Sequence, residues 1–290
     1  MSRTTVIAET AGATRRFGAF TAVSDVSIGV SEGEIVGLIG ANGAGKTTLI
    51  RMLLGLLPPS AGRVALFGEL PSRRTRRRLG YVPQSLGLYT DLTVTENLRF
   101  TAQAFGAEVP ADLPRELADA GDRLVGDIGL GLQRRLAFVA ALCHAPALLV
   151  LDEPTSGVDP LARSRLWDTI HAQADRGVGV LVTTHYMQEA DQCDRLVIMV
   201  AGRVAATGSV SDIVAGRTAV QVDSDAWEAA FTALAAAGLP VLLAGRSVRV
   251  PDAGVAEIRR TLDAAQVSAR VTEAPSTLDE TLITLIRSAA

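Results

Sequence analysis

Residues 40–47, which read GANGAGKT, restrict the possible folds more than any other stretch of the sequence. The pattern is G-x-x-x-x-G-K-[ST], in which glycines let the backbone curl so that N–H groups point inward at a phosphate chain. An apolar run at 34–39 precedes it, and a segment with helical apolar spacing follows it as far as Pro58. A strand, a phosphate-binding loop and a helix are therefore expected in that order.

Lys46 within this motif is the only lysine in a chain with 28 Lys and Arg residues. Its compact ammonium suits a tight phosphate loop better than the wide, planar guanidinium of arginine does. We expect Lys46 to reach the β and γ phosphates of a nucleotide, and the Thr47 hydroxyl to ligate Mg²⁺. The nucleotide-binding residues predicted here are Gly40, Ala41, Asn42, Gly43, Ala44, Gly45, Lys46, Thr47 and Thr48.

A second chemical motif, LLVLDEP, occupies residues 148–154. Asp152 ends an apolar run typical of a buried strand, where its carboxylate can hold Mg²⁺ through water. Glu153 follows, in a position to polarise a water molecule for attack on the γ phosphate. Two acids after a strand often only cap a helix or face solvent, but a phosphate loop in the same chain favours the chemical interpretation.

The remaining patterns predict an α/β fold with a second domain. Buried-strand runs at 147–151 and 178–183 alternate with helical patterns, which indicates a mostly parallel sheet with helices on its faces. Turn residues and short helical segments suggest a helical insertion at about 85–145. After residue 216 the pattern restarts as a small α+β unit close to β-α-β-β-α-β, so we predict domains at 1–216 and 217–290.

Composition narrows the classes of function. A net charge of −3 gives no general reason to bind nucleic acid, and the run RRTRRR at 73–78 reads as solvated helix surface more readily than as an anion or lipid-headgroup patch. Cys143 and Cys193 fit no zinc or redox spacing and suit a reducing cytoplasm. No apolar run reaches the length of a membrane helix, so another chain would have to cross a membrane.

These motifs together resemble the ATP-binding subunit of ATP-binding cassette (ABC) transporters over about residues 5–215. The resemblance implies a P-loop NTPase cassette with a mostly parallel core sheet, an antiparallel β subdomain and a helical subdomain. It also implies that Phe17 stacks on adenine, that Gln84 contacts the Mg²⁺ and water region, and that His185 hydrogen-bonds the γ phosphate. Asp159 belongs to the D-loop pattern SGVD. Taken singly, these residues would be core or loop side chains; their order and spacing favour the family roles.

Residues 128–132 fall where the family has its signature, usually Leu-Ser-Gly-Gly-Gln. Gly129 replaces the serine and Leu130 the first glycine, while Gly131 and Leu132 complete the segment. In the family this segment closes over ATP held by a second cassette. The backbone N–H groups remain, and the lost hydroxyl is worth roughly 1.5–3 kcal/mol as a donor to a charged phosphate. A narrower resemblance connects the chain to bacterial multidrug-efflux cassettes that work with ABC-2 type membrane subunits.

The resemblance therefore implies an ATPase that uses ATP and Mg²⁺ to drive export of a drug-like or hydrophobic compound. Its partners would be an integral membrane permease of ABC-2 type and a second cassette, identical or not, with no nucleic acid. It would lie peripherally on the cytoplasmic face of the cell membrane. Two alternatives stay open: a non-transport ABC ATPase, and a degenerate regulatory cassette that leaves hydrolysis to a paralogue.

Overall fold

The computed structural model describes residues 5–288, so residues 1–4 and 289–290, at the ends of the two predicted domains, lie outside the described residues. Contacts between residues divide the chain into two compact units, Met1–Val204 and Ala205–Ala290. The first unit contains every site residue that the sequence analysis selected.

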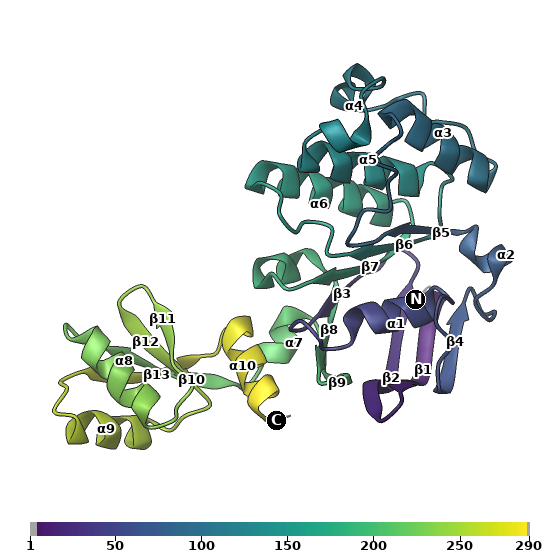
Figure 1. Ribbon diagram of the computed structural model, residues 1–290. Helices are drawn as coiled ribbons and strands as arrows, with labels where there is room; N and C mark the ends of the chain where they lie inside the picture. Colours follow the sequence, from purple (N-terminus) through teal and green to yellow (C-terminus); the bar gives the residue numbers. More distant parts are fainter. Residues whose placement is uncertain (1–4, 289–290) are drawn as a thin grey trace. The chain divides into compact units, whose positions relative to one another are not determined.

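A six-stranded sheet forms the centre of the first unit, and its last strand, β9, continues past Val204 (Figure 1). Its strand order is β5-β6-β7-β3-β8-β9, and the four neighbouring pairs from β5 to β8 are parallel. The strands are β3 (Ile35–Ile39), β5 (Leu79–Val82), β6 (Leu148–Asp152), β7 (Gly179–Thr184), β8 (Arg195–Val200) and β9 (Arg203–Gly208). All residues of β3, β6 and β7 are buried, which explains why these strands read as apolar runs without alternation.

Helix α1 (Lys46–Leu53) separates this sheet from an antiparallel one. The antiparallel sheet has the order β2-β1-β4 and comprises β1 (Val6–Phe17), β2 (Phe20–Ser31) and β4 (Ala61–Leu66). Leu49, Ile50 and Leu53 of α1 share one buried core with both sheets. The core therefore fixes the start of α1 relative to the end of β3.

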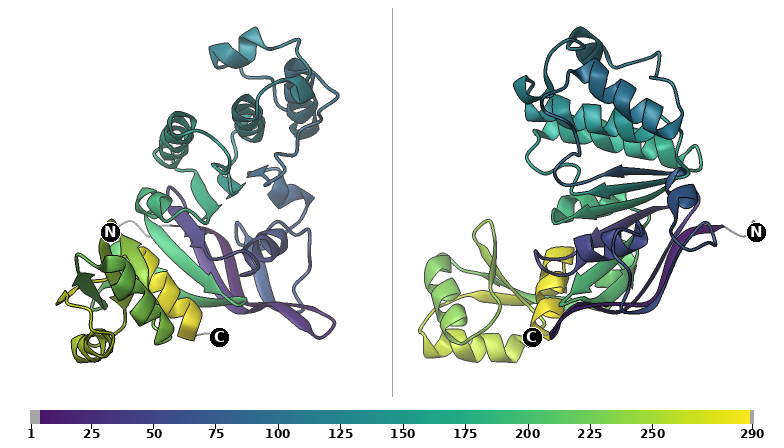
Figure 2. Two further views of the ribbon diagram at one scale, coloured as in Figure 1. Left: turned by 60° about the vertical axis from the view of Figure 1, so that its left-hand side comes forward. Right: turned by 45° about the vertical axis from the view of Figure 1, so that its right-hand side comes forward.

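Helices α5 (Leu130–Leu142) and α6 (Pro160–Ala174) cover the opposite face of the six-stranded sheet (Figure 2). Phe138 and Trp167 are their largest residues in that contact. Beyond α5, a separate apolar cluster that includes Val94, Leu98 and Leu117 stabilises the helical subdomain. Its other elements are α3 (Val94–Phe105), α4 (Arg115–Asp119) and the 3-10 turn η1 (Val125–Asp127). The short helix α2 (Arg73–Arg76) precedes β5, and the 3-10 segment η2 (Met187–Gln192) follows β7.

The second unit contains an antiparallel sheet of order β11-β12-β10-β13. Its strands are β10 (Thr218–Asp223), β11 (Leu242–Ala244), β12 (Ser247–Pro251) and β13 (Arg270–Pro275), and its helices are α7 (Val210–Val214), α8 (Trp227–Ala236), α9 (Val255–Ala264) and α10 (Leu278–Ser288). From β10 to β13 the elements follow the β-α-β-β-α-β order of ferredoxin-like domains. Valines of β10 and β12 pack against α8 and α9.

The predicted parallel core, antiparallel sheet, helical subdomain and small α+β region are all present. The division between the units falls at Val204, earlier than the boundary that the sequence placed at 216. Helix α7 packs against α10, which accounts for the assignment of residues 210–214 to the second unit. Across residues 5–288, we find no helix with the length and apolarity that crossing a membrane requires.

Candidate functional site

The glycine-rich loop connects the end of β3 to the start of α1. Gly45 occupies the position before α1 with φ of 98°, and a Cβ there would lie 2.5 Å from the carbonyl oxygen of Ala22. Both the backbone conformation and the close approach therefore require glycine. The register of the sheet brings Ile39 opposite Thr184, and Asp152 opposite Thr183, so the loops that follow β3, β6 and β7 emerge side by side.

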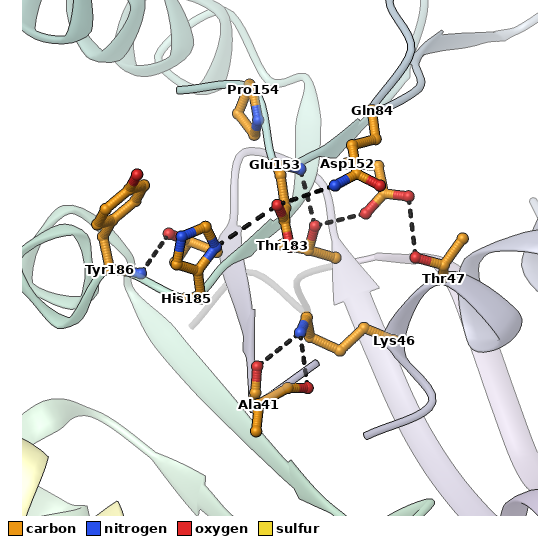
Figure 3. Close-up of polar contacts among 12 residues, drawn as sticks. Ala41, Lys46, Thr47, Gln84, Asp152, Glu153, Pro154, Thr183, His185 and Tyr186 are labelled. Carbon is orange, nitrogen blue, oxygen red and sulfur yellow. Dashed lines mark hydrogen bonds and ion pairs between the residues drawn. The ribbon is translucent and has the colours of Figure 1, made fainter. Parts of the chain in front are cut away.

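Lys46 is buried, with 6% of its surface exposed. Its Nζ donates hydrogen bonds to the carbonyl oxygens of Gly40 at 2.6 Å and Ala41 at 3.2 Å (Figure 3). Burial lowers the pKa of Lys46, and the neighbouring carboxylates of Glu153 and Asp152 partly offset this shift. The ammonium is thus held inside the loop, at the position where a phosphate chain would enter.

The Asp152 carboxylate, at the end of β6, accepts two hydrogen bonds. Thr47 Oγ1 donates to Oδ2 at 3.2 Å, and Thr183 Oγ1 donates to Oδ1 at 2.7 Å. A hydroxyl and a carboxylate in contact beside a phosphate loop are the hard oxygen ligands that suit Mg²⁺. The residues present therefore fit the metal predicted from the sequence.

Glu153 stands at a strained position directly after β6. Its φ is 52°, in the left-handed region that residues other than glycine rarely adopt. Its Oε2 accepts a hydrogen bond from Gln84 Nε2 at 3.2 Å and lies 3.5 Å from His185 Nδ1 (Figure 3). The three residues that sequence reasoning selected as catalytic are therefore brought together around one carboxylate oxygen.

Two residues that sequence reasoning missed hold the backbone around this carboxylate. Thr183 Oγ1 accepts a hydrogen bond from the Glu153 backbone N–H at 2.9 Å while it donates to Asp152. Arg134 of α5 is 6% exposed, and its Nη1 donates to the carbonyl oxygens of Glu153 at 3.1 Å and Pro154 at 2.9 Å. The only sequence signal for Thr183 was its place two residues before His185. Arg134 gave none, because nineteen residues separate it from Glu153.

A cavity of about 390 Å³ adjoins the loop. Its lining includes seven of the nine loop residues predicted to bind nucleotide, Asn42, Gly43, Ala44, Gly45, Lys46, Thr47 and Thr48, together with Gln84 and Glu153. Gly40 and Ala41 contribute carbonyl oxygens to Lys46 instead. Phe20 lines the cavity, whereas Phe17, the aromatic residue predicted from the sequence, does not. Phe17 and Phe20 are paired in the register of the β1–β2 hairpin, and the guanidinium of Arg15 lies 4.7 Å from the centre of the Phe17 ring.

The signature segment and Asp159 do not line this cavity. Gly129, Leu130 and Gly131 are exposed at the start of α5, and no side chain caps that helix end. Exposed N–H groups at a helix start can bind an anion supplied from outside the chain. Asp159 caps α6 by accepting from the Ala162 N–H at 2.9 Å, and backbone hydrogen bonds lower the pKa of this exposed carboxyl group.

The fold and this constellation define a nucleotide-binding cassette with a phosphate loop, an acid pair and a polar cluster at the carboxyl ends of parallel strands. Comparison with known proteins agrees. The family described as "ABC transporter" matches residues 23–156. The chain belongs to the ABC transporter family, as an ATP-binding cassette.

Two curated relatives illustrate the similarity. The "Nod factor export ATP-binding protein I" of Burkholderia orbicola is 42% identical over 207 residues, which cover 67% of this chain and 68% of that protein. The "Probable multidrug ABC transporter ATP-binding protein YbhF" of Escherichia coli is 38% identical over 232 residues, covering 76% of this chain. The chain spans only 40% of the length of YbhF.

A solved structure described as "Structure of ATP binding subunit of ABC transporter" is similar with a TM-score of 0.67 and 32% sequence identity. The match covers 71% of this chain and 91% of the solved chain.

Proposed function

We propose that this chain hydrolyses ATP to drive export of a drug-like or hydrophobic compound through a separate membrane subunit. The observation that carries the proposal is the Glu153 carboxylate, which contacts Gln84 and approaches His185 at the wall of the phosphate-loop cavity. A general base must lie within hydrogen-bond reach of the water that it activates, and this group combines a carboxylate with two polar neighbours that can orient that water.

In this mechanism the loop amides bind the phosphates of ATP, and Lys46 exchanges its bonds to Gly40 and Ala41 for bonds to phosphate oxygens. Mg²⁺, held by Thr47 and by Asp152 with Gln84 nearby, would neutralise phosphate charge. Glu153 accepts a proton from the attacking water. The water oxygen bonds to the γ phosphorus, and the bond between the γ phosphorus and the leaving oxygen of ADP breaks. His185 donates to the γ phosphate as negative charge develops there.

We further propose that two cassettes act together. Gly129, Leu130, Gly131 and Leu132 at the start of α5 would meet the γ phosphate of ATP in the partner cassette, with Asp159 at the same interface. The exposure of residues 129–131, and the separation of the whole segment from the chain's own cavity, support a role toward a nucleotide held elsewhere. Phe17 would stack on adenine, with Phe20 beside it on the cavity wall.

A second, mostly apolar groove of about 340 Å³ is our proposed docking site for an ABC-2 type membrane subunit. Pro83, Leu86 and Leu88 line this groove, and Gln84 belongs to the same loop. Because the Gln84 amide also bonds to Glu153, an occupant that shifts the loop would change the surroundings of the catalytic carboxylate. This connection supports coupling between the membrane subunit and hydrolysis.

The direction and cargo rest on relatives, since the curated names mention multidrug transport and Nod factor export. With that partner, the chain would lie peripherally on the cytoplasmic face of the cell membrane. Nucleic acid is not among the partners we propose, because the chain has a net charge of −3.

The test is Glu153→Gln, which keeps the side-chain shape and removes the base. We expect ATP binding to persist while turnover falls by about a hundredfold or more. Glu228→Gln on the exposed face of α8 is the charge-matched control and should leave turnover unchanged. ATP binding and phosphate release are measured on the purified proteins; full turnover in Glu153→Gln would contradict the assignment of the base.

One observation favours the regulatory alternative. Gly129 offers no side-chain donor, and the start of α5 carries no side-chain cap. If the chain only regulated a catalytic paralogue, the purified protein would bind ATP without releasing phosphate, alone or with its membrane partner. Steady phosphate release by this chain without a paralogue would exclude that alternative.

A further inference from the structure

A dense group of arginines forms part of the surface of the first unit and has no role in the site described above. Between residues 35 and 90 the sequence contains seven arginines and a single acid, Glu69, although the whole chain has a net charge of −3. Arg73, Arg74, Arg77 and Arg78 are exposed on and after α2. Figure 1 shows α2 beside β5, the edge strand of the six-stranded sheet.

Few acids neutralise these arginines. Glu69 lies 3.7 Å from Arg74, and both side chains are more than half exposed, so the pair is weak. The guanidinium carbon of Arg78 lies 3.8 Å from the centre of the Phe67 ring. Among the described residues, no acid forms an ion pair with Arg78. Arg76 instead turns inward and donates to the Leu54 carbonyl oxygen at 3.4 Å.

Exposed leucines lie beside the arginines. Leu70 is 74% exposed and Leu56 is 61% exposed, the first and fourth highest values among the exposed large apolar residues of the described chain. Gly55 approaches Pro71 so closely that a Cβ on Gly55 would lie 2.5 Å from the Pro71 Cβ. The turn that carries Leu56 is therefore packed against the segment that leads into α2.

We propose that this basic patch, defined as Arg73, Arg74, Arg77, Leu56 and Leu70, binds anionic phospholipid headgroups at the membrane surface. The inference rests on the proposed function, because Leu56 and Arg76 also line the groove assigned to the membrane subunit. A subunit docked there brings the patch next to the bilayer.

Guanidinium groups pair with phosphate through two parallel hydrogen bonds, and leucines can enter the boundary between headgroups and acyl chains. Nucleic acid would satisfy the arginines but would leave both leucines in water. The combination of charge and apolar surface therefore favours a lipid surface over a nucleic acid.

The test is co-sedimentation of the full chain with vesicles of phosphatidylcholine alone or with about one third phosphatidylglycerol, at low salt. We expect binding to the anionic vesicles only, and weakening at high salt. Each arginine near a membrane surface contributes about fivefold to partitioning, so Arg73→Gln/Arg74→Gln/Arg77→Gln should lose on the order of a hundredfold. Leu70→Ser should lower partitioning to the vesicles by about fivefold. Because this loss comes from apolar burial, it should be the same at low and high salt.

A matched control removes three exposed arginines elsewhere, as Arg63→Gln/Arg176→Gln/Arg260→Gln, and should retain binding within about twofold. Three results would overturn the proposal: no binding to anionic vesicles, equal losses in the patch and control variants, or patch-dependent binding to duplex DNA without binding to vesicles.

The ATPase assay separates this proposal from the proposed function. Normal ATP turnover with failed vesicle binding would reject only the lipid patch. Vesicle binding by a chain that cannot hydrolyse ATP would reject the proposed catalysis and keep the patch.

Discussion

Arg134→Met is the substitution that most directly tests how the site holds Glu153, the proposed base. Arg134 Nη1 donates to the carbonyl oxygens of Glu153 and Pro154, and its side chain is 6% exposed. Burial lowers the pKa of Arg134, partly offset by the Glu153 carboxylate, but arginine stays protonated in proteins. Hydrogen bonds from a charged donor are worth about 1.5–3 kcal/mol each, so the pair is large enough to offset the roughly 1–3 kcal/mol of strain at Glu153.

Without Arg134, we expect the backbone at Glu153 to relax from its φ of 52° and to carry the carboxylate away from Gln84 and His185. A displacement of about 1 Å at a reacting group can cost on the order of a hundredfold in rate. We therefore predict that Arg134→Met lowers kcat by about that factor, while KM for ATP changes by less than about threefold because the phosphate loop is untouched.

The assay is steady-state phosphate release, with thermal unfolding measured in parallel. Arg134→Lys, which keeps a buried donor near the two carbonyls, should recover part of kcat. The reasoning is refuted if Arg134→Met retains kcat within about twofold of the parent. If Arg134→Met lowers ATP binding, kcat and thermal stability together, and Arg134→Lys restores none of them, then Arg134 has a structural role only.

Further predictions concern the signature and the second unit. Gly129 has φ of −62° and open space where a Cβ would lie, so the Gly129→Ser variant should fold. The added hydroxyl should raise dimerisation or turnover by no more than about tenfold. A large loss of activity would show that the site is adapted to glycine. That gain should shrink in an Arg134→Met background, which a double-mutant cycle on kcat measures. Glu280→Gln should destabilise the second unit by about 3 kcal/mol, because Arg249 loses its buried partner. Urea unfolding followed by Trp227 fluorescence measures this loss. The double variant Glu280→Met/Arg249→Met should recover most of it.

The same ion pair predicts a dependence of stability on acid. Burial alone would raise the pKa of Glu280, but hydrogen bonds from Arg249 and Thr277 hold its pKa below the ordinary value. A lowered folded-state pKa stabilises the unit above the unfolded pKa of about 4.3, and that stability is lost as pH falls through the folded pKa. Glu280→Gln should remove this acid-dependent component, and an unchanged pH profile would contradict the assignment.

The sequence was sufficient for residues whose chemistry depends on neighbours in the chain. The spacing of Gly40, Gly45 and Lys46 predicts the loop, and the apolar run before Asp152 predicts a buried strand end. Both elements occur in the structure because apolar strands buried on two faces must form a covered parallel sheet. Their parallel pairing with β7 then brings the loops after these strands to one edge.

Residues that act through contacts between distant segments could not be found in this way. Arg134 reads as one more charged residue on a helix, yet it is buried against the strand end at Glu153. Phe20 lies on the cavity wall because of the path of the β1–β2 hairpin, which spacing from the glycine loop does not determine. The assignment of residues 210–214 to the second unit likewise depends on packing between α7 and α10, segments that lie far apart in the sequence.

Helix α5 joins the two ends of the proposed reaction within one chain. Its first residues expose the N–H groups of the signature, and Arg134, a little more than one turn later, bonds to the backbone that carries Glu153. Leu136, Ala137 and Phe138 are buried. Because close packing resists bending, the helix should respond to a force at one end as a rigid element. A partner nucleotide that draws the start of α5 toward itself must therefore also act on the carbonyls of residues 153–154. In the proposed dimer, glycine in place of serine at residue 129 would weaken the contact with the partner nucleotide. It would leave the connection to Glu153 intact, because that connection depends on Arg134 and not on residue 129.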